Sequence, residues 1–193
     1  HRRLCICNRH QPSTLSNTIK INIFTKKDIK GVITLAIRQR RTEADYLKIK
    51  DNYEFLGTGF TAIDEKPAAQ TKEVRYVCDA STSTSIVSYK WQSDFEGDQI
   101  ISEKAIEFIV QSAKEMKTGG DCETEYVKVD LDRPAKTAGY YAREFHVAVQ
   151  VDEFPNNDGD LGMSGVFMGL GDPKVGTFDP ATKKFTEGFE PKA

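Results

Sequence analysis

Apolar and polar residues alternate along most of the chain. The pattern is clearest over residues 141–151, where Phe145, Val147 and Val149 fall on one face. Successive side chains of a strand point to opposite faces, so this period of two predicts strands. The predicted strands span residues 29–38, 53–62, 73–80, 85–95, 124–131, 141–151, 161–170, 174–178 and 184–186.

Each predicted strand has one polar and one apolar face, as in antiparallel sheets that are buried on one side. Residues 38–52 are polar and are expected to form a loop between strands. Residues 64–73 and 80–85 are also polar, and we expect them to form the outer parts of a long projecting hairpin. The apolar faces include Val87, Tyr89, Trp91 and Phe95 in one strand and Val127, Val129 and Leu131 in another.

One segment, residues 101–120, has helical periodicity instead. Ser102 is the expected N-cap, and Gly119-Gly120 is the expected left-handed stop after a helix over residues 102–117. The stripe expected to pack on a sheet consists of Ile101, Ala105, Phe108, Ile109, Ser112 and Met116. Strands, one helix and further strands together predict a mainly β fold. We expect two packed antiparallel sheets, as a β-sandwich or partly closed barrel, with one flanking α-helix.

The composition is that of an ordinary globular chain. Of 193 residues, 38% are hydrophobic and 29% are charged, which suits one domain. No apolar run reaches the roughly 20 residues of a membrane helix, so we expect no membrane partner. The basic segment over residues 1–16 has no apolar core of the kind a secretory signal needs. We expect it to be either disordered or an artefact.

Four cysteines are spread along the chain without a motif, which favours a reducing compartment. Cys5 and Cys7, together with His1 and His10, offer four zinc-ligating side chains. Their spacing is tighter than the usual spacer between zinc ligands. The segment is therefore better interpreted as a disordered tail, and no metal site is predicted.

Charge is unevenly distributed although the net charge is only −2. Residues 1–50 hold 12 of the 27 Lys and Arg but 3 of the 29 Asp and Glu. A basic start on an acidic body is compatible with nucleic-acid binding and with contacts between copies of the chain. The basic part lacks interleaved aromatic residues, which favours the contacts between copies.

Three loops were tested as sites of chemistry. Residues 169–174 begin like a phosphate-binding loop, but Lys174 stands where the third glycine belongs and a strand follows. Residues 156–162 alternate oxygen ligands, but Leu161 and Phe167 replace the glycine and glutamate of a calcium loop. Residues 162–165 lack the last glycine of a nucleophile elbow. We predict turns at the first two of these places, and neither an enzyme nor a cofactor.

The second half of the chain resembles a known family. Its motifs are "EKAIEFIVQSAKEMKTGGDCETEYVKVDL", "YYAREFHVAVQVDEFPNNDGDLGMSGVF" and a closing "GDPKVGTFDPATKKFT". They are similar to the major tail tube proteins of long-tailed bacteriophages, especially those of Gram-positive hosts, or of a related phage-tail-like particle. The resemblance covers about residues 29–187 and implies a single tail-tube β domain over residues 17–193 with a C-terminal extension.

The resemblance implies a structural virion protein. Homohexameric rings would stack helically into a hollow tail tube, with tape measure, tail terminator and distal tail proteins as partners. DNA would pass through the lumen from capsid to host cell without sequence-specific binding, and assembly would take place in the host bacterial cytoplasm.

Two polar segments are expected to make the contacts between copies. In the projecting hairpin these are Lys72, Arg75 and Asp79, and in the polar segment before it Arg40 and Arg41. Two other functions remain open. A monomeric β-sandwich binding module would recognise a carbohydrate or a host surface, and a nucleic-acid binder would use the basic start of the chain.

Overall fold

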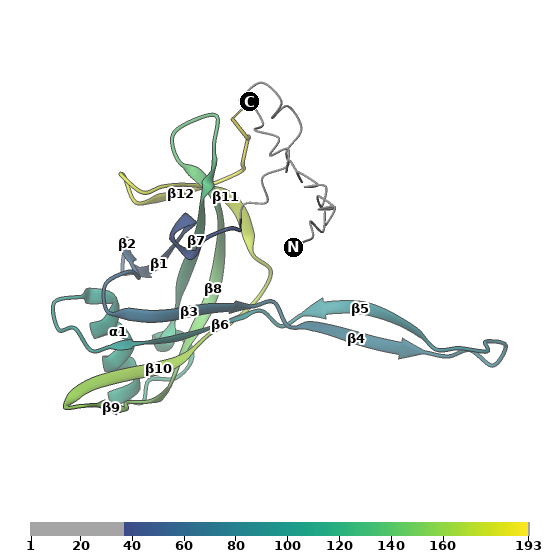
Figure 1. Cartoon of the computed structure of the whole chain (residues 1–193), viewed down its shortest axis with the longest axis horizontal. Helices are drawn as coiled ribbons and strands as arrows, with labels where there is room; N and C mark the ends of the chain where they lie inside the picture. The colour runs from purple at the N-terminus through teal and green to yellow at the C-terminus, as the bar shows by residue number, and fades with distance from the viewer. Residues whose placement is uncertain (1–36, 193) are drawn as a thin grey trace, which may run out of the picture. The chain divides into compact units, whose positions relative to one another are not determined.

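Twelve strands, one α-helix and two short 3-10 helices make up residues 37–192, the part of the chain that the structure, a computed structural model, describes (Figure 1). The 3-10 helices are Arg40–Thr42 and Gly119–Cys122, and α1 is Lys104–Lys114. The strands are β1 Glu43–Ile49, β2 Asn52–Phe55, β3 Phe60–Lys66, β4 Ala69–Val74, β5 Ser83–Tyr89, β6 Gln92–Asp98, β7 Glu123–Pro134, β8 Tyr140–Glu153, β9 Asn156–Asn157, β10 Asp160–Gly169, β11 Lys174–Asp179 and β12 Lys184–Glu187.

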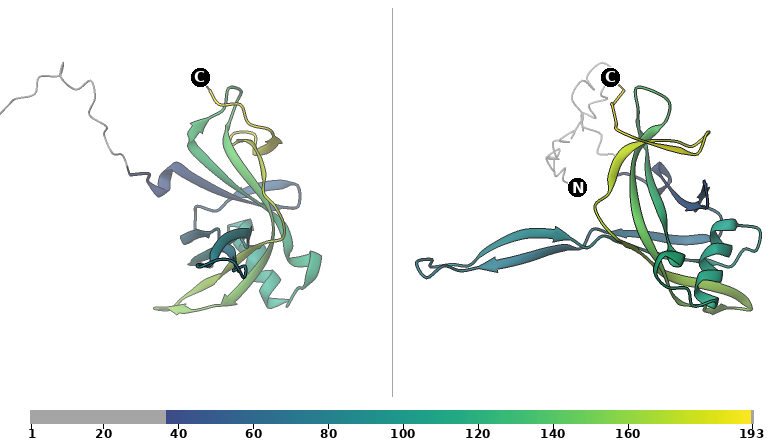
Figure 2. Two further views of the ribbon diagram at one scale, coloured as in Figure 1. Left: turned by 90° about the vertical axis from the view of Figure 1, so that its right-hand side faces the viewer. Right: turned by 180° about the vertical axis from the view of Figure 1, so that it is seen from behind.

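Ten of these strands form one curled antiparallel sheet. Seven of them follow the order β2-β1-β7-β8-β10-β6-β3, and three join beside this path: β11 pairs with β8, β12 with β11, and β9 with β10. The long strand β8 changes its neighbour along its length: its first part pairs with β11 and its later part with β10. The remaining strands, β4 and β5, form a separate two-stranded hairpin. That hairpin continues from β3 and leads into β6, and it runs away from the curled sheet (Figures 1 and 2).

The curled sheet carries a core on each of its two faces. The larger core joins side chains from β1 and β3, which lie near opposite ends of the strand order, so it fills the interior of the curl. Its fully buried aromatics are Phe95, Tyr126, Phe145 and Phe167. The smaller core lies on the other face, where Phe178 of β11 packs against Tyr46 of β1 and Tyr53 of β2. It contains Ala44, Tyr46, Tyr53, Val127, Val129, Ala142 and Phe178.

Helix α1 packs on the larger core and covers it. It buries Ala105, Ile106, Ile109 and Val110, while Phe108 is only partly buried. The expected stripe is therefore wrong at both ends, because Ile101 and Met116 are exposed. They lie outside the 11 residues that are helical, so helical spacing does not place them.

The ends of the helix also differ from the sequence prediction. Glu103, not Ser102, is the N-cap, and no side chain caps the helix. Met116 takes the left-handed conformation with φ of 51°. The N–H of Met116 donates to Ala113 O and the N–H of Lys117 to Ser112 O, as in a Schellman motif. The helix therefore ends before the predicted Gly119-Gly120 stop, which belongs instead to the second 3-10 helix.

The mainly β class with one helix is confirmed. Of the two expected arrangements, the partly closed barrel describes the main sheet, and the second sheet is the projecting hairpin. The strands predicted over 124–131, 141–151, 161–170, 174–178 and 184–186 are present with extended ends. No described helix is long and apolar enough to span a membrane.

One loop prediction and three strand predictions need correction. Residues 38–52 are not a loop, since they include β1, whose buried Asp45 pairs with Arg40. The predicted strand 53–62 is broken at Gly59, whose φ is +85°. The strand predicted over 73–80 ends at Val74, before the hairpin turns, and the strand predicted over 85–95 is interrupted between β5 and β6, where the hairpin rejoins the sheet.

Residues 29–36 of the first predicted strand, and the whole 1–16 segment, lie outside the described residues. Ile37 and Arg38 are described and belong to no strand. The predicted boundary of a domain at residue 17 therefore stays a prediction.

Candidate functional site

The predicted contact residues lie in two places. Lys72 is an exposed residue of β4, opposite Ser85 of β5. Arg75 and Asp79 lie beyond the end of β4, where Arg75 Nε donates a long hydrogen bond of 3.4 Å to the Asp79 carbonyl oxygen. Arg40 and Arg41 belong to the 3-10 helix before β1. The hairpin residues therefore lie apart from Arg40 and Arg41, and the structure does not bring the two sets together within one chain.

The hairpin exposes apolar side chains that the sequence reading assigned to a buried face. Every residue of β5 is exposed, and so is every residue of β4 except Val74, which is half-buried. A two-stranded hairpin with both faces in water is marginally stable at best, so burial against another surface would stabilise this one. Its exposed apolar residues are Tyr76, Val77, Ile86, Val87 and Tyr89.

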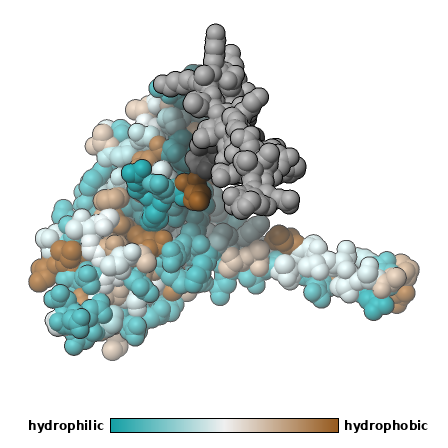
Figure 3. All heavy atoms as spheres, viewed as in Figure 1, coloured by the Kyte–Doolittle hydropathy of each residue, from teal (hydrophilic) through white to brown (hydrophobic). Residues whose placement is uncertain are grey.

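The tip of the hairpin has a defined turn. The N–H of Asp79 donates to Tyr76 O at 3.0 Å, and the Asp79 carboxylate accepts the N–H of Tyr76 at 3.2 Å. This pair of bonds closes residues 76–79 on themselves and leaves Val77 fully exposed. Figure 3 shows hydrophobic surface at the end of the hairpin.

The curled sheet is not closed into a barrel. Among the described strands, β3 pairs only with β6. One edge of β3 therefore lacks a strand partner. Strand β2 pairs with β1 only from Tyr46 onward, so the first three residues of β1 have no partner in β2. Those three residues have no strand beside them on the edge away from β7, but the N–H of Leu56 donates to Asp45 O and Arg40 donates to Glu43 O on that edge. Unpaired edges are templates for pairing with another chain unless something covers them. We call the gap between these two edges the seam.

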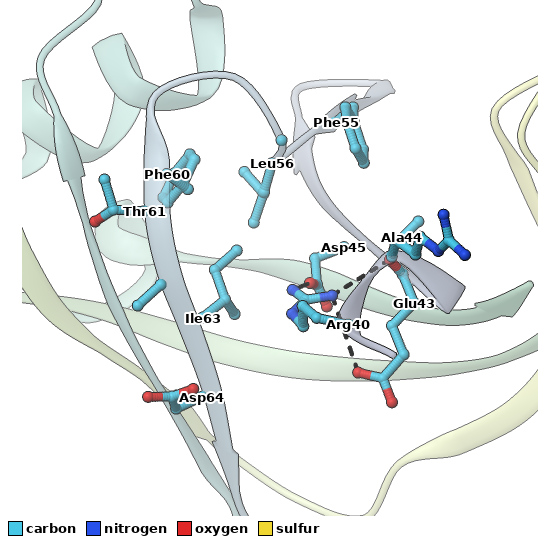
Figure 4. Close-up of a pocket in the computed structure, with 13 residues that line it drawn as sticks. Arg40, Glu43, Ala44, Asp45, Phe55, Leu56, Phe60, Thr61, Ile63 and Asp64 are labelled. Atoms are coloured by element: carbon cyan, nitrogen blue, oxygen red, sulfur yellow. Dashed lines mark hydrogen bonds and ion pairs between the residues drawn. The ribbon is translucent and has the colours of Figure 1, made fainter. Parts of the chain in front are cut away.

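A cavity of about 470 Å³ lies at the seam (Figure 4). Leu56 and Ile63 point into the gap from its two sides, with Phe60 beside them on β3. Arg40, Glu43 and Asp45 form its polar side. Arg41 and Asp64 also line the cavity, and both are exposed residues that make no ion pair within residues 37–192. The seam cavity therefore combines apolar walls with charges of both signs.

Beyond the seam, the interior of the curl is divided into an apolar and a charged half. Four strands each place an apolar residue and, two positions away, a charged residue on the interior face. The charged residues are Asp45, Glu65, Lys128 and Arg143, and their apolar neighbours are Leu47, Ile63, Tyr126 and Phe145. We call these four charged residues the interior ion cluster.

Hydrogen bonds hold the interior ion cluster together. Arg143 makes two bonds to Glu65, at 2.7 and 3.0 Å, and Trp91 Nε1 donates to the same carboxylate at 2.7 Å. Lys128 Nζ lies 3.5 Å from Glu65 and 3.9 Å from Asp45. Asp45 also accepts the Tyr126 hydroxyl, at 2.5 Å, and a bond from Arg40. Each buried charge thus has an opposite charge as its partner, which buried ions require.

The electrostatics of Glu65 follow from these contacts. Burial acts to raise the pKa of the Glu65 carboxyl, but hydrogen bonds from Arg143 and Trp91 and the charges of Arg143 and Lys128 outweigh it. The pKa of Glu65 therefore lies below its ordinary value of 4.5. Glu65 stays ionised in the folded chain at neutral pH.

Sequence reasoning missed the interior ion cluster. It treated Lys128 and Asp130 as members of a solvent-facing side of β7, but both are buried. Both faces of β7 are covered, because Val127 and Val129 belong to the smaller core on one face and Tyr126 to the larger core on the other. The available signal was Arg143, a charged residue in the otherwise apolar face of its strand.

Of the three segments considered for chemistry, two contain turns, and residues 162–165 lie within β10. Residues 156–162 contain the tight turn between β9 and β10, where Asp158 and Gly159 have φ of 51° and 106°, as a type I′ hairpin turn requires. Residues 169–174 lead into β11, not into a helix. Within residues 37–192 no group of His, Cys, Asp and Glu side chains is arranged to hold a metal ion. His146 is an exposed residue 3.1 Å from Glu123.

Comparison with known proteins adds a likeness in fold. No family model and no curated protein matches the sequence. Among solved structures, the chain is similar to a chain of the 6-fold symmetrised cryo-EM structure of the anti-feeding prophage (AFP) baseplate. The two are 8% identical with a TM-score of 0.47, over 74% of this chain and 95% of that one.

Proposed function

We propose that this chain is a structural subunit of a phage-tail-like particle, whose copies associate into rings that stack into a hollow tube. The observation that carries the proposal is the β4–β5 hairpin, which exposes five large apolar or aromatic side chains. A hairpin of this kind is stable when another surface covers it. The resemblance to major tail tube proteins supports identifying that surface as a further copy of the chain.

The open edge of the sheet supports the same proposal. The outer edge of β3 has no strand partner within the described chain. A copy that pairs with or covers this edge removes the hazard that it presents. In the assembled particle, DNA passes through the lumen without sequence-specific binding, and tape measure, terminator and distal tail proteins bind the ends of the tube.

The proposal is tested by the size of the assembled protein. Concentrated protein is expected to form rings or rods in negative-stain images, and dilute protein to dissociate toward the 21.7 kDa monomer. A monomer that persists at millimolar concentration would support the monomeric binding module instead. Salt-dependent DNA binding by that monomer would favour the nucleic-acid binder.

The role of the hairpin is tested by shortening it. Ala69 and Tyr89 face each other across the hairpin, so a Gly-Gly link in place of residues 70–88 closes a tight turn. We expect the shortened chain to fold, because the removed residues contribute nothing to either core. It should form no rods. Intact long rods from this variant would show that the hairpin does not join the copies.

A milder change provides a matched control. Val87→Thr keeps the size and β-branching of an exposed hairpin residue but adds a hydroxyl, and Val175→Thr makes the same change on exposed β11. We expect the Val87 variant to need several-fold more protein before rods appear. The Val175 variant should assemble like the parent chain.

A further inference from the structure

The tip of the hairpin and the seam cavity have complementary surfaces. The tip presents Tyr76 and Val77 to solvent on a turn closed by its own hydrogen bonds. The cavity is walled by apolar residues of β1, β2 and β3 and the turn between β2 and β3. A cavity of about 150 Å³ accommodates one benzene ring. The seam cavity, at about 470 Å³, has room for one aromatic and one branched side chain.

The charges around the two surfaces also match. The tip carries one cation and one anion, Arg75 and Asp79. The cavity offers one exposed anion and one exposed cation, Asp64 and Arg41, neither of which makes an ion pair within the described chain. Opposite charges at the rim of a contact fix its orientation and speed its formation.

A single copy cannot make this contact with itself. The hairpin extends directly from β3 and runs away from the curled sheet that contains the seam (Figures 1 and 2). Backbone pairing of β3 with β6 fixes the base of the hairpin in that direction. The tip and the cavity can therefore meet only between two copies.

We infer that the hairpin tip of one copy inserts Tyr76 and Val77 into the seam cavity of a second copy, with Asp79 paired to Arg41 and Arg75 paired to Asp64. This inference rests on the proposed self-assembly and adds the site of contact. The contact joins two different surfaces of the chain, so each copy both donates a tip and receives one. Such heterologous contacts continue from copy to copy in one direction, as stacking into a tube requires.

Cross-linking tests the contact directly, because the tip carries the exposed residue Cys78. In a chain with Cys5, Cys7 and Cys122 changed to Ser, Thr61→Cys places a second thiol on the lining of the cavity. Assembled protein is treated with a short bismaleimide and run on a denaturing gel. We expect a ladder beyond the dimer, with peptides that link position 61 to Cys78 of another copy. Mixing isotope-labelled and unlabelled chains identifies links between copies.

Two controls make the result specific. Adding Cys78→Ser to the Thr61→Cys chain should abolish the ladder. Thr182→Cys, in the exposed turn between β11 and β12, should give none in the same background. Assemblies that form without a link between position 61 and Cys78 would overturn this inference and leave the proposed function standing. Failure to assemble at any concentration would overturn both.

The rate at which the Thr61→Cys thiol reacts with a maleimide shows whether something other than a second copy fills the cavity. With a monofunctional maleimide, we expect fast labelling in dilute monomer and at least tenfold slower labelling in assemblies. Protection already present in the dilute monomer would show that another part of the chain, such as residues 1–36, fills the cavity. That result would overturn the inference.

Exchanging charges tests the polar part of the contact. Asp64→Arg and Arg75→Asp should each raise the protein concentration needed for assembly by about tenfold, since each places like charges together. The double variant restores an opposite pair and should assemble near the parent concentration. Single variants that assemble like the parent, or a double variant no better than either, would contradict the Arg75–Asp64 pairing.

Discussion

Strands β5 and β6 follow each other in the sequence and share one alternating pattern, yet they are buried to opposite extents. Val87 and Tyr89 of β5 are 58% and 63% exposed, whereas Trp91 and Phe95, next in the same series, are 8% and 1% exposed. Trp91 stacks on Phe145 and Phe95 stacks on Phe167, with ring centroids 3.9 and 4.5 Å apart. Within residues 37–192, the residues of β5 have no such partners.

The comparison shows what alternation does and does not encode. A period of two predicts a strand with one face suited to burial, but it does not tell which chain covers that face. In β6 the cover is the rest of the curled sheet. In β5, on the function proposed above, it is another copy. Exposed apolar residues in a continuous series are thus a signal of assembly, not a flaw of the fold.

The largest expected difference between the two strands is in stability. Phe95→Ala removes a fully buried ring from the larger core and should lower the free energy of unfolding by roughly 3–5 kcal/mol. Tyr89→Ala should change it by less than about 0.5 kcal/mol in dilute protein, because the ring is in water. Urea unfolding of both variants at low concentration measures the difference. Equal losses would show that β5 is covered within its own chain.

A smaller loss of stability is expected when the interior ion cluster is disrupted. This cluster belongs to the curled sheet and has no counterpart in the hairpin. Glu65→Gln removes the charge that pairs with Arg143 and Lys128 and should lower the free energy of unfolding by roughly 1.5–3 kcal/mol at neutral pH. Glu153→Gln, at the exposed end of β8, is the matched control and should change stability little.

Glu65 should also make the stability of the fold depend on pH. The folded pKa of Glu65 lies below 4.5, so its contribution to stability is complete above that pH and is lost as the pH falls through the folded pKa. The Glu65→Gln chain should therefore lose less stability than the parent between about pH 5 and pH 3. Parallel curves for the two chains would contradict this account of the cluster.

The smallest expected change in the free energy of unfolding is at the junction where the hairpin leaves the sheet. Ala68 has φ of 47°, a left-handed conformation that costs a non-glycine residue roughly 1 kcal/mol, and its carbonyl accepts the N–H of Lys90. Ala68→Gly should leave stability unchanged or raise it by up to about 1 kcal/mol. Ala62→Gly, within β3, should lower it by roughly 0.5–1 kcal/mol. A loss at Ala68 as large as at Ala62 would contradict the junction geometry.

Much of the fold was predictable from local patterns. The strands of the second half and the helix follow from their spacing, and the projecting hairpin from its polar flanks. The predictions failed where neighbours in space override local character. β1 contains Asp45 and Glu43 and looks like a loop, but Arg40 and Lys128 neutralise these carboxylates. The helix end failed for a local reason, since Met116 takes the left-handed position that glycine usually takes.

The candidate site was only partly predictable. Its residues Arg75, Asp79 and Arg41 were singled out as polar members of surface segments, and Tyr76 and Val77 were expected to lie in a strand. The seam cavity, the interior ion cluster and the exposure of Val87 and Tyr89 depend on which strands meet.

The sequence by itself determined that the chain is mainly β with one helix, and where the strands of its second half form, because backbone preference and periodicity act over a few residues. Only the tertiary structure decided which faces are covered, which charges are paired and which edges stay open. Those properties depend on contacts between residues far apart in the chain, such as Glu65 with Arg143 and Asp45 with Tyr126.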